Sequence, residues 1–381
     1  MEVMKQLLAQ STNAGSPPPE CSSSPHVALL PGMNMEGDRV TPSRPVPPSH
    51  QSPAGHLRLR PELILWQADR GTKRGFRMKV IIDTDIGESI DDILAIAFAL
   101  NSPELEVVAI TTVNGDTQAR SRIARRLTST FGKPDIPVAA GHGGSMPRGG
   151  RGIHREVSVT QGRLATDEAG LPEPSPLPAD ELIAGLAAEQ PGEIYVLTIG
   201  AMTNVGHALV RFPKTAPNLR GVISCGGRFA MPPVSIGWNL RDDPIAAAVT
   251  ACADVDWTLI SEGLMSEAPL REYDIQRIRD AGLPTTDLIA EAIKLWRKNE
   301  PNGATDPCLD DLTVFFHLLD PDSIPVRAGR AIIAVAPDRI AELWVEHDPA
   351  GPHALARPIE QPRAEELRDL FMSRILTPPP G

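Results

Sequence analysis

Several carboxylates follow a short aliphatic run near residue 80. The segment VIIDTDIGESIDD, residues 80–92, contains Asp83, Asp85, Asp91 and Asp92 together with one glutamate. Like charges a few ångströms apart repel each other unless a counter-charge neutralises them. Ligand sets made only of oxygen suit a hard cation such as Ca²⁺ or Mg²⁺. The segment therefore predicts a cation site, and the alternative for its last two aspartates is simple placement at a helix N-terminus, where the helix dipole favours them.

A second kind of chemistry shares part of this pattern. A D-x-D pair at a strand end also occurs in phosphatases that use an aspartate nucleophile, in which a Thr or Val stands two residues after the second aspartate. Here that position is Gly87. The sequence therefore disfavours the phosphatase reaction.

Alternating strand and helix patterns must position these carboxylates. The strand KVIID precedes the helix DDILAIAFALN, and further strands are expected at EVVAITTV, IPVAAG, EIYVLTIG, GVISCGG and DWTLISEG, with helical segments between them. Such alternation predicts an α/β fold: an open, mostly parallel central sheet with helices on both faces. Ligands of these sheets bind beyond the carboxyl ends of the strands. The acidic segment lies at one such end, and TIGAMTN, SCGGRF and SEG lie at others.

The N-terminal part of the chain differs from the rest in composition. Residues 1–77 are rich in Pro, Ser and Gly, and such a segment cannot bury enough apolar surface to fold. We expect a disordered extension over 1–77, a catalytic domain over 78–375 and a short tail over 376–381. Met78 is a candidate natural start, and a regulatory tail is the alternative interpretation of the extension.

Composition narrows the possible partners. The formal net charge of −11 argues against nucleic acid or an anionic membrane. No run approaches the roughly 18 apolar residues of a membrane span, and the N-terminus lacks the apolar core of a signal peptide. The four cysteines have no metal-binding spacing. A reduced, cytoplasmic protein is expected.

Five ordered motifs resemble those of the inosine–uridine-preferring nucleoside hydrolase family. DTDIGESIDD resembles the D-x-D-x-G-x-D-D signature with two extra residues, and AITTVNGDT resembles the second strand and its loop. LTIGAMTN is similar to a G-P-L-T-N turn, CGGRF…WNLRDDPIAAAV to a G-G…F-N…D-P-E-A-A segment, and LDDLTVFFHLLDPD to H-D-P-L-A-V-A…D-P. The resemblance covers roughly residues 79–375.

The resemblance implies a Ca²⁺-dependent enzyme that hydrolyses the N-glycosidic bond of a ribonucleoside and releases ribose and the free base. It implies that Ca²⁺ is held by Asp85, Asp92, Asp310 and the main-chain carbonyl of Ile199. Alignment of the hydrophobic residues that follow makes Asp310, and not Asp311, the last metal aspartate. Asp85 would also be the catalytic residue, activating the attacking water.

The same resemblance implies a set of substrate-binding residues. Asp91 and Asn239 would hold sugar hydroxyls, and Asp116 stands where the family has an asparagine. Trp238 is a candidate for stacking on the base, with core packing as the alternative. His154 is a candidate leaving-group acid, with an exposed loop histidine as the alternative. Members of the family are commonly oligomers, so a homodimer or homotetramer is expected.

Two positions depart from the family pattern. Leu309 replaces the His that precedes the last metal aspartate, and Gly237 replaces the Glu that precedes the aromatic–Asn pair and contacts the sugar. These changes leave two alternatives open: a hydrolase of an unusual N-glycoside in specialised metabolism, or a catalytically impaired protein that binds Ca²⁺ and sugar.

Overall fold

The computed structural model describes residues 77–146, 159–166, 170–230, 234–300, 305–335, 341–359 and 361–379. A compact unit extends from Phe76 to Gly381, and its first strand begins at Met78. The N-terminal extension expected over 1–77 lies outside the described residues except for its last position. Its boundaries therefore stay predictions.

Within the described residues, one sheet of nine strands forms the centre of the fold, in the order β3-β2-β1-β4-β5-β6-β9-β7-β8. Its strands are β1 Met78–Thr84, β2 Leu105–Thr112, β3 Val138–Ala140, β4 Ile194–Thr198, β5 Gly221–Cys225, β6 Trp257–Ile260, β7 Val326–Ala334, β8 Glu342–Glu346 and β9 His353–Ala356. The first seven strands in this order, from β3 through β2, β1, β4, β5 and β6 to β9, pair in parallel with their neighbours. Strand β7 is antiparallel to both β9 and β8.

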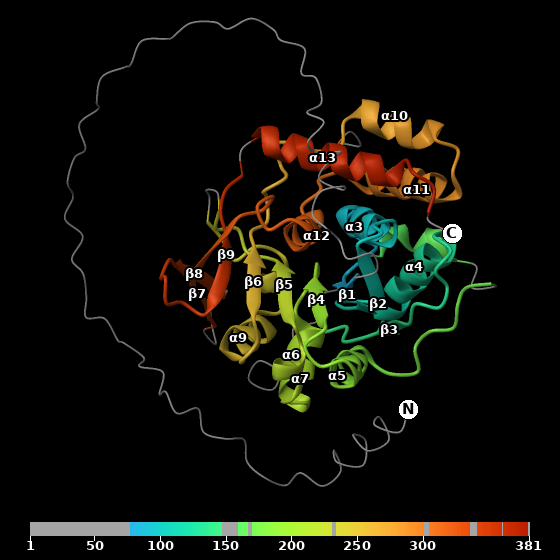
Figure 1. Cartoon of the computed structure of the whole chain (residues 1–381). Helices are drawn as coiled ribbons and strands as arrows, with labels where there is room; N and C mark the ends of the chain where they lie inside the picture. Colours follow the sequence, from blue (N-terminus) through green and yellow to red (C-terminus); the bar gives the residue numbers. More distant parts are fainter. Residues whose placement is uncertain are drawn as a thin grey trace, which may run out of the picture. The chain divides into compact units, whose positions relative to one another are not determined.

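Helices cover both faces of the sheet (Figure 1). One hydrophobic core lies under α3 Asp91–Leu100, α4 Thr117–Thr130, α10 Glu272–Asp280, α11 Pro284–Asn299, α12 Leu312–Leu319 and α13 Gln361–Ile375. The other lies under α5 Ala179–Glu189, α6 Thr203–Arg211, α7 Thr215–Asn218 and α9 Pro244–Cys252. The short helices η1 Thr160–Ala165 and α8 Asn239–Asp242 complete the described elements. The predicted open, mostly parallel α/β sheet with helices on both faces is confirmed.

Helix α3 is buried along almost its whole length, and this burial fixes the position of its first turn. Every residue from Asp92 to Leu100 is buried. Phe98 packs edge-on against Phe316 of α12, with ring centroids 5.4 Å apart. Full burial of one such side chain stabilises the fold by about 1.5–3 kcal/mol. Helix α3 is therefore held against α12.

The strand order reverses at β1. Because β1 lies between β2 and β4, the chain leaves it toward one side of the sheet and later returns to the other. The carboxyl ends of β1 and β4 consequently form the kind of crevice in which α/β sheets bind ligands. Two glycines allow the chain to turn here: Gly87 has φ +114°, and a Cβ on Gly200 would lie 2.7 Å from the Asp85 nitrogen.

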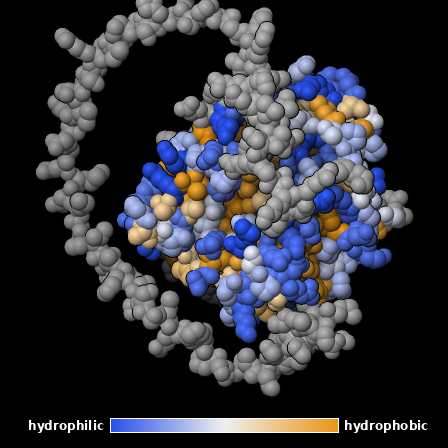
Figure 2. All heavy atoms as spheres, in the orientation of Figure 1, coloured by the Kyte–Doolittle hydropathy of each residue, from blue (hydrophilic) through white to orange (hydrophobic). Residues whose placement is uncertain are grey.

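The visible surface is largely hydrophilic, with hydrophobic side chains between the polar ones (Figure 2). Among the helices that the structure describes, none combines the length and apolar character needed to cross a membrane.

Candidate active site

A cavity of about 460 Å³ lies at the carboxyl ends of β1, β4, β5 and β6. It brings together seven residues singled out from the sequence: Asp85, Asp91, Asp92, Ile199, Trp238, Asn239 and Asp310. Its lining also includes acidic groups that the sequence-based assignment leaves out, namely Glu88, Asp242, Glu262, Glu300 and Asp311. The cavity is therefore the place where the predicted residues converge.

Three aspartates form a tight cluster on one wall of this cavity. Asp91, Asp92 and Asp311 each offer a carboxylate oxygen, and the three oxygens lie within 4.8 Å of one another. Burial raises the pKa of all three carboxyls, to about 6 for Asp91, and the negative charges of neighbouring carboxylates raise them further. Oδ1 of Asp91 is buried without a hydrogen-bond partner among the described residues. Buried oxygen atoms of this kind fit a hard divalent cation.

Helix capping does not account for this cluster. The N-cap residue of α3 is Ile90, so the two aspartates that follow stand inside the first turn. Asp92 accepts a hydrogen bond from the Thr84 hydroxyl, which comes from the end of β1. Asp311 is the N-cap residue of α12, yet its side chain makes no capping hydrogen bond. Its carboxylate is directed instead toward the other two.

The structure separates the two adjacent aspartates before α12. Both carboxylate oxygens of Asp310 accept backbone N–H groups, Oδ2 from Gly263 at 2.8 Å and Oδ1 from Met265 at 3.0 Å. Asp311 joins the acidic cluster. The geometry thus favours Asp311 over the sequence-based choice of Asp310 as a cation ligand. Consecutive side chains at a helix start point in different directions, and aligned hydrophobic positions alone do not reveal which of the two carboxylates joins the cluster.

A buried arginine supports the acidic loop from behind. Arg120 of α4 is fully buried. Its guanidinium donates to the carbonyl oxygens of Asp85 and Ile86, and its Nε donates to that of Asn114 at 2.7 Å. Burial raises the pKa of the Asp85 carboxyl, and the Arg120 charge opposes that rise. The sequence held a signal for this role, because Arg120 lies on the same helical face as the buried Ile123.

Two further groups hold the strand ends in place. Asp83 accepts hydrogen bonds from Thr111 at 2.6 Å and from Asn204 at 2.7 Å, and its burial raises its pKa to about 7. The amide of Asn239 donates to the carbonyl oxygen of Ile199 at 3.1 Å. It also donates to the carbonyl oxygen of Cys225 at 2.9 Å. Asn239 therefore connects β4 and β5 at the edge of the cavity.

Other predicted residues lie elsewhere or play another part. Asp116 is exposed and is absent from the cavity lining, because its carboxylate accepts the N–H of Ala119 at 2.9 Å and caps α4. Trp238 lies at the cavity with 59% of its surface exposed, and the Arg241 guanidinium covers its ring at 3.9 Å from the centroid. Leu309 is fully buried. His154 lies outside the described residues.

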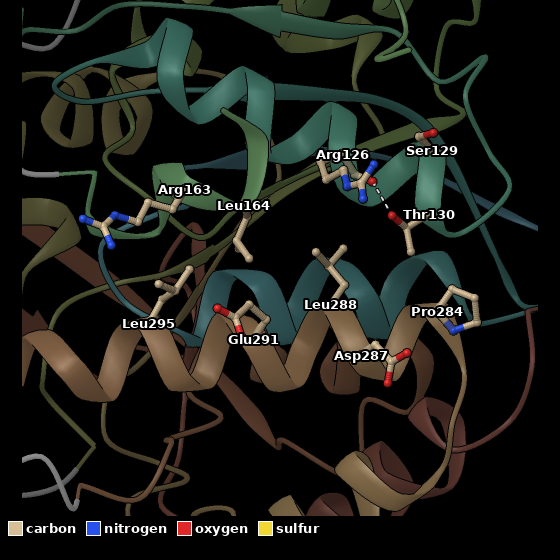
Figure 3. A pocket seen from close by; sticks show the side chains of 10 residues that line it. All are labelled: Arg126, Ser129, Thr130, Arg163, Leu164, Pro284, Asp287, Leu288, Glu291 and Leu295. Atoms are coloured by element: carbon tan, nitrogen blue, oxygen red, sulfur yellow. Dashed lines mark hydrogen bonds between the residues drawn. The ribbon is translucent and has the colours of Figure 1, made fainter. Parts of the chain in front are cut away.

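A groove of about 640 Å³ lies between α4, η1 and α11 (Figure 3). Leu164, Leu288 and Leu295 line it together with side chains of both charges, such as Arg126 and Glu291. None of the residues predicted for the site lines this groove.

His142, Asp180 and His207 also offer three ligand atoms within 4.8 Å of one another. However, the two imidazole rings are stacked 3.8 Å apart at 11°, so one ion cannot lie in both ring planes. Asp180 is also paired with Arg211. This cluster is therefore a poor cation site as it stands.

Comparison with known proteins relates the chain to enzymes. Residues 80–358 match the family described as inosine-uridine preferring nucleoside hydrolase. Uridine nucleosidase 1 of Arabidopsis thaliana is 31% identical over 274 residues, covering 68% of this chain and 79% of that protein. The pyrimidine-specific ribonucleoside hydrolase RihA of Salmonella paratyphi B is 29% identical over 259 residues, covering 64% and 80%. The solved structure of the plant nucleoside hydrolase PpNRh1 is similar with a TM-score of 0.66 and 25% identity, covering 79% of this chain and 99% of that one.

Proposed function

The chain belongs to the inosine-uridine preferring nucleoside hydrolase family of N-ribohydrolases, and from this premise we propose that it is a Ca²⁺-dependent hydrolase that converts a pyrimidine ribonucleoside into ribose and the free base. The observation that carries the proposal is the buried cluster of Asp91, Asp92 and Asp311 at the point where the strand order reverses. A cation among these carboxylates would relieve the repulsion that raises their pKa values.

The donor set supports calcium. Asp85, Asp92, Asp311 and the carbonyl oxygen of Ile199 line one cavity and offer only oxygen ligands. Ca²⁺ accepts many oxygen ligands in flexible geometry, so sugar hydroxyls can complete its coordination. When bound, the cation would orient the sugar and make the attacking water easier to deprotonate.

The reaction consumes one water. Its oxygen forms a bond to the anomeric carbon of the ribose while the C–N bond to the base breaks, through a sugar cation of oxocarbenium character. Asp85 accepts the proton that the water loses, the leaving nitrogen takes up a proton from solvent, and Asp85 then returns its proton to solvent, so that no net proton is gained or lost. Asn239, fixed by the carbonyls of Ile199 and Cys225, orients the sugar beside Asp85.

The base occupies the mouth of the cavity in this proposal. Trp238 stands there, largely exposed, and a planar base can stack on the face of its ring opposite the Arg241 guanidinium. Two of the similar proteins are named for uridine and for pyrimidine nucleosides. Uridine is therefore the first substrate to test.

The comparisons favour hydrolysis of a ribonucleoside over an unusual N-glycoside or a binding-only role. We further propose, on the family relationship, a cytoplasmic homodimer or homotetramer. Light scattering of the purified full chain and fractionation of its native cells test these two points.

The decisive experiment measures sugar release. The full chain is incubated with uridine, cytidine, inosine and adenosine in Ca²⁺ or in chelator, and free reducing sugar is measured. We expect release from uridine that is lost with chelator and with Asp85→Asn. Asp254→Asn, an exposed aspartate between α9 and β6, is the matched control and should be fully active. Sugar release that is unchanged in chelator would refute the metal-dependent mechanism.

A further inference from the structure

Gly237 and Glu262 come from different parts of the chain and occupy one space. Gly237 has φ +70°, and a Cβ built on it would lie 2.5 Å from Oε1 and 2.7 Å from Oε2 of Glu262. No side chain fits at residue 237 while Glu262 keeps this position. The carboxylate of Glu262 thus stands where a side chain of residue 237 would begin.

Backbone N–H groups hold the Glu262 carboxylate at this place. The N–H of Trp238 donates to Oε1 at 2.9 Å and to Oε2 at 3.1 Å, and the N–H of Asn239 donates to Oε1 at 3.3 Å. The backbone is fixed as well, because the N–H of Glu262 donates to the carbonyl oxygen of Gly227 at 2.7 Å. A carboxylate offers about four acceptor sites. Glu262 therefore keeps acceptor capacity for a further donor.

Glu262 faces the candidate active site. It lines the cavity together with the acidic cluster and with both residues whose N–H groups it accepts. Burial raises its pKa to about 7, and the charges of Asp310 and Asp91 add to the rise. A carboxyl group in such a setting is desolvated and makes a strong hydrogen bond to a hydroxyl of a ligand.

Four other acidic side chains of the cavity have other roles. Both oxygens of Asp310 accept backbone N–H groups, and Asp242 accepts the amide of Asn114 at 2.9 Å. Asp91 and Asp311 belong to the cluster. Glu262 differs from these four, because it is anchored by the N–H groups of Trp238, proposed to face the base, and Asn239, proposed to face the sugar.

We propose that Glu262 binds the primary hydroxyl of the substrate's ribose and so selects intact ribosides over 5′-deoxyribosides. This inference rests on the proposed function. A cation chelates two oxygens best when they are neighbours, which assigns the vicinal hydroxyls of the ribose to the acidic cluster. The primary hydroxyl lies across the ring from that pair and requires a separate acceptor. Glu262 supplies it from the end of β6, in place of the side chain that Gly237 lacks.

The test compares two substrates in two proteins. Uridine and 5′-deoxyuridine differ only in the primary hydroxyl, and Glu262→Gln removes the charge while keeping the shape. On uridine, we expect Glu262→Gln to lower kcat/KM about 10–100-fold, the usual effect of losing a hydrogen bond to a charged group. On 5′-deoxyuridine, Glu262→Gln should lower kcat/KM by less than about threefold. Glu267→Gln, an exposed glutamate a few residues further on, is the matched control and should leave both values unchanged.

Each contrary outcome has a distinct meaning. An equal loss on both substrates would overturn the assignment. A loss that disappears with p-nitrophenyl riboside, whose leaving group needs no protonation, would overturn it in favour of a leaving-group acid. The rise in Tm on addition of Ca²⁺ shows whether the variant is folded with an intact cation site.

A binding measurement separates this inference from the proposed function. If the wild-type protein hydrolyses no nucleoside, the proposed function fails, and calorimetry with D-ribose and 5-deoxy-D-ribose in Ca²⁺ becomes the test of Glu262. Tighter binding of D-ribose by the wild type, lost in Glu262→Gln, would support the assignment. Equal binding of the two sugars by the wild type would overturn it.

Discussion

Replacing Asp311 by asparagine should stabilise the cation-free protein and remove most of its stabilisation by calcium. The carboxylate oxygens of Asp311, Asp91 and Asp92 lie within 4.8 Å of one another. Two ionised groups at that distance repel each other by about 3.5 kcal/mol at an effective dielectric constant near 20. Burial and mutual repulsion raise the pKa values of these carboxyls, and any proton that they bind makes the realised repulsion smaller.

We expect Asp311→Asn to raise the stability of the chelated protein by about 2 kcal/mol, equivalent to roughly 4–8 °C in Tm. Added calcium should stabilise the wild type by about 2.7 kcal/mol when its concentration is a hundred times the dissociation constant. If the substitution weakens binding a hundredfold, the same calcium stabilises the variant by only about 0.4 kcal/mol.

Asp310→Asn is the matched comparison, because it changes the neighbouring residue in the same way. An asparagine cannot accept the N–H groups of both Gly263 and Met265, so the variant should lose about 1–3 kcal/mol of stability with or without calcium. Its calcium-dependent rise in Tm should persist. Thermal unfolding in chelator and in calcium measures all of these quantities.

The reverse pattern would refute this reasoning. If Asp310→Asn abolished the calcium-dependent rise while Asp311→Asn retained it, the ligand would be the residue chosen by sequence alignment. The orientation of the two side chains before α12 would then be wrong as a guide to the site.

Three other predictions concern the catalytic residue, the buried arginine and the pH dependence. Asp85→Asn should lower kcat for uridine by about 10²–10⁴-fold, measured as sugar release, and near-normal turnover would contradict its role. Arg120→Met should lower the free energy of unfolding by about 3–5 kcal/mol in urea titrations, because three backbone carbonyl oxygens and nearby carboxylates lose a buried cation; an unchanged midpoint would contradict this. Folding raises the pKa of the Glu262 carboxyl to about 7, so the folded state binds more protons than the unfolded state. The stability that this carboxyl contributes should therefore be lost as the pH rises from about 4.5 to about 7, and the Tm of Glu262→Gln should fall less over that range; parallel curves would contradict this.

The fold and two of the three clustered aspartates were accessible from the sequence, because both depend on local patterns. The alternation of aliphatic strands and amphipathic helices predicts the sheet, and the order of the motifs predicts the family. Asp91 and Asp92 follow directly from their position after β1. Asp311 does not, because the packing of α12 under α3 decides which of two adjacent carboxylates joins the cluster.

Glu262 could not be found from the sequence for a related reason. The segment SEG after β6 is too short to carry a periodic pattern, and its partner Gly237 lies on a different loop. Their proximity depends on the pairing of β5 with β6. Asp116 illustrates the opposite error, since an aspartate after a strand can cap the next helix as well as reach a ligand. Arg120 was detectable, because a charged residue stands on the apolar face of α4.

The contact between Gly237 and Glu262 also constrains how this site can change by mutation. A side chain at residue 237 would overlap the Glu262 carboxylate where it now lies, and φ +70° would strain it, so acidic side chains at both positions require the Glu262 carboxylate to move. A glutamate introduced at residue 237 should be harmful while Glu262 is present. The same glutamate should be tolerated better after Glu262 has been replaced by a small residue. We therefore expect sign epistasis between the two substitutions: the glutamate at residue 237 costs less in a background in which residue 262 is already small.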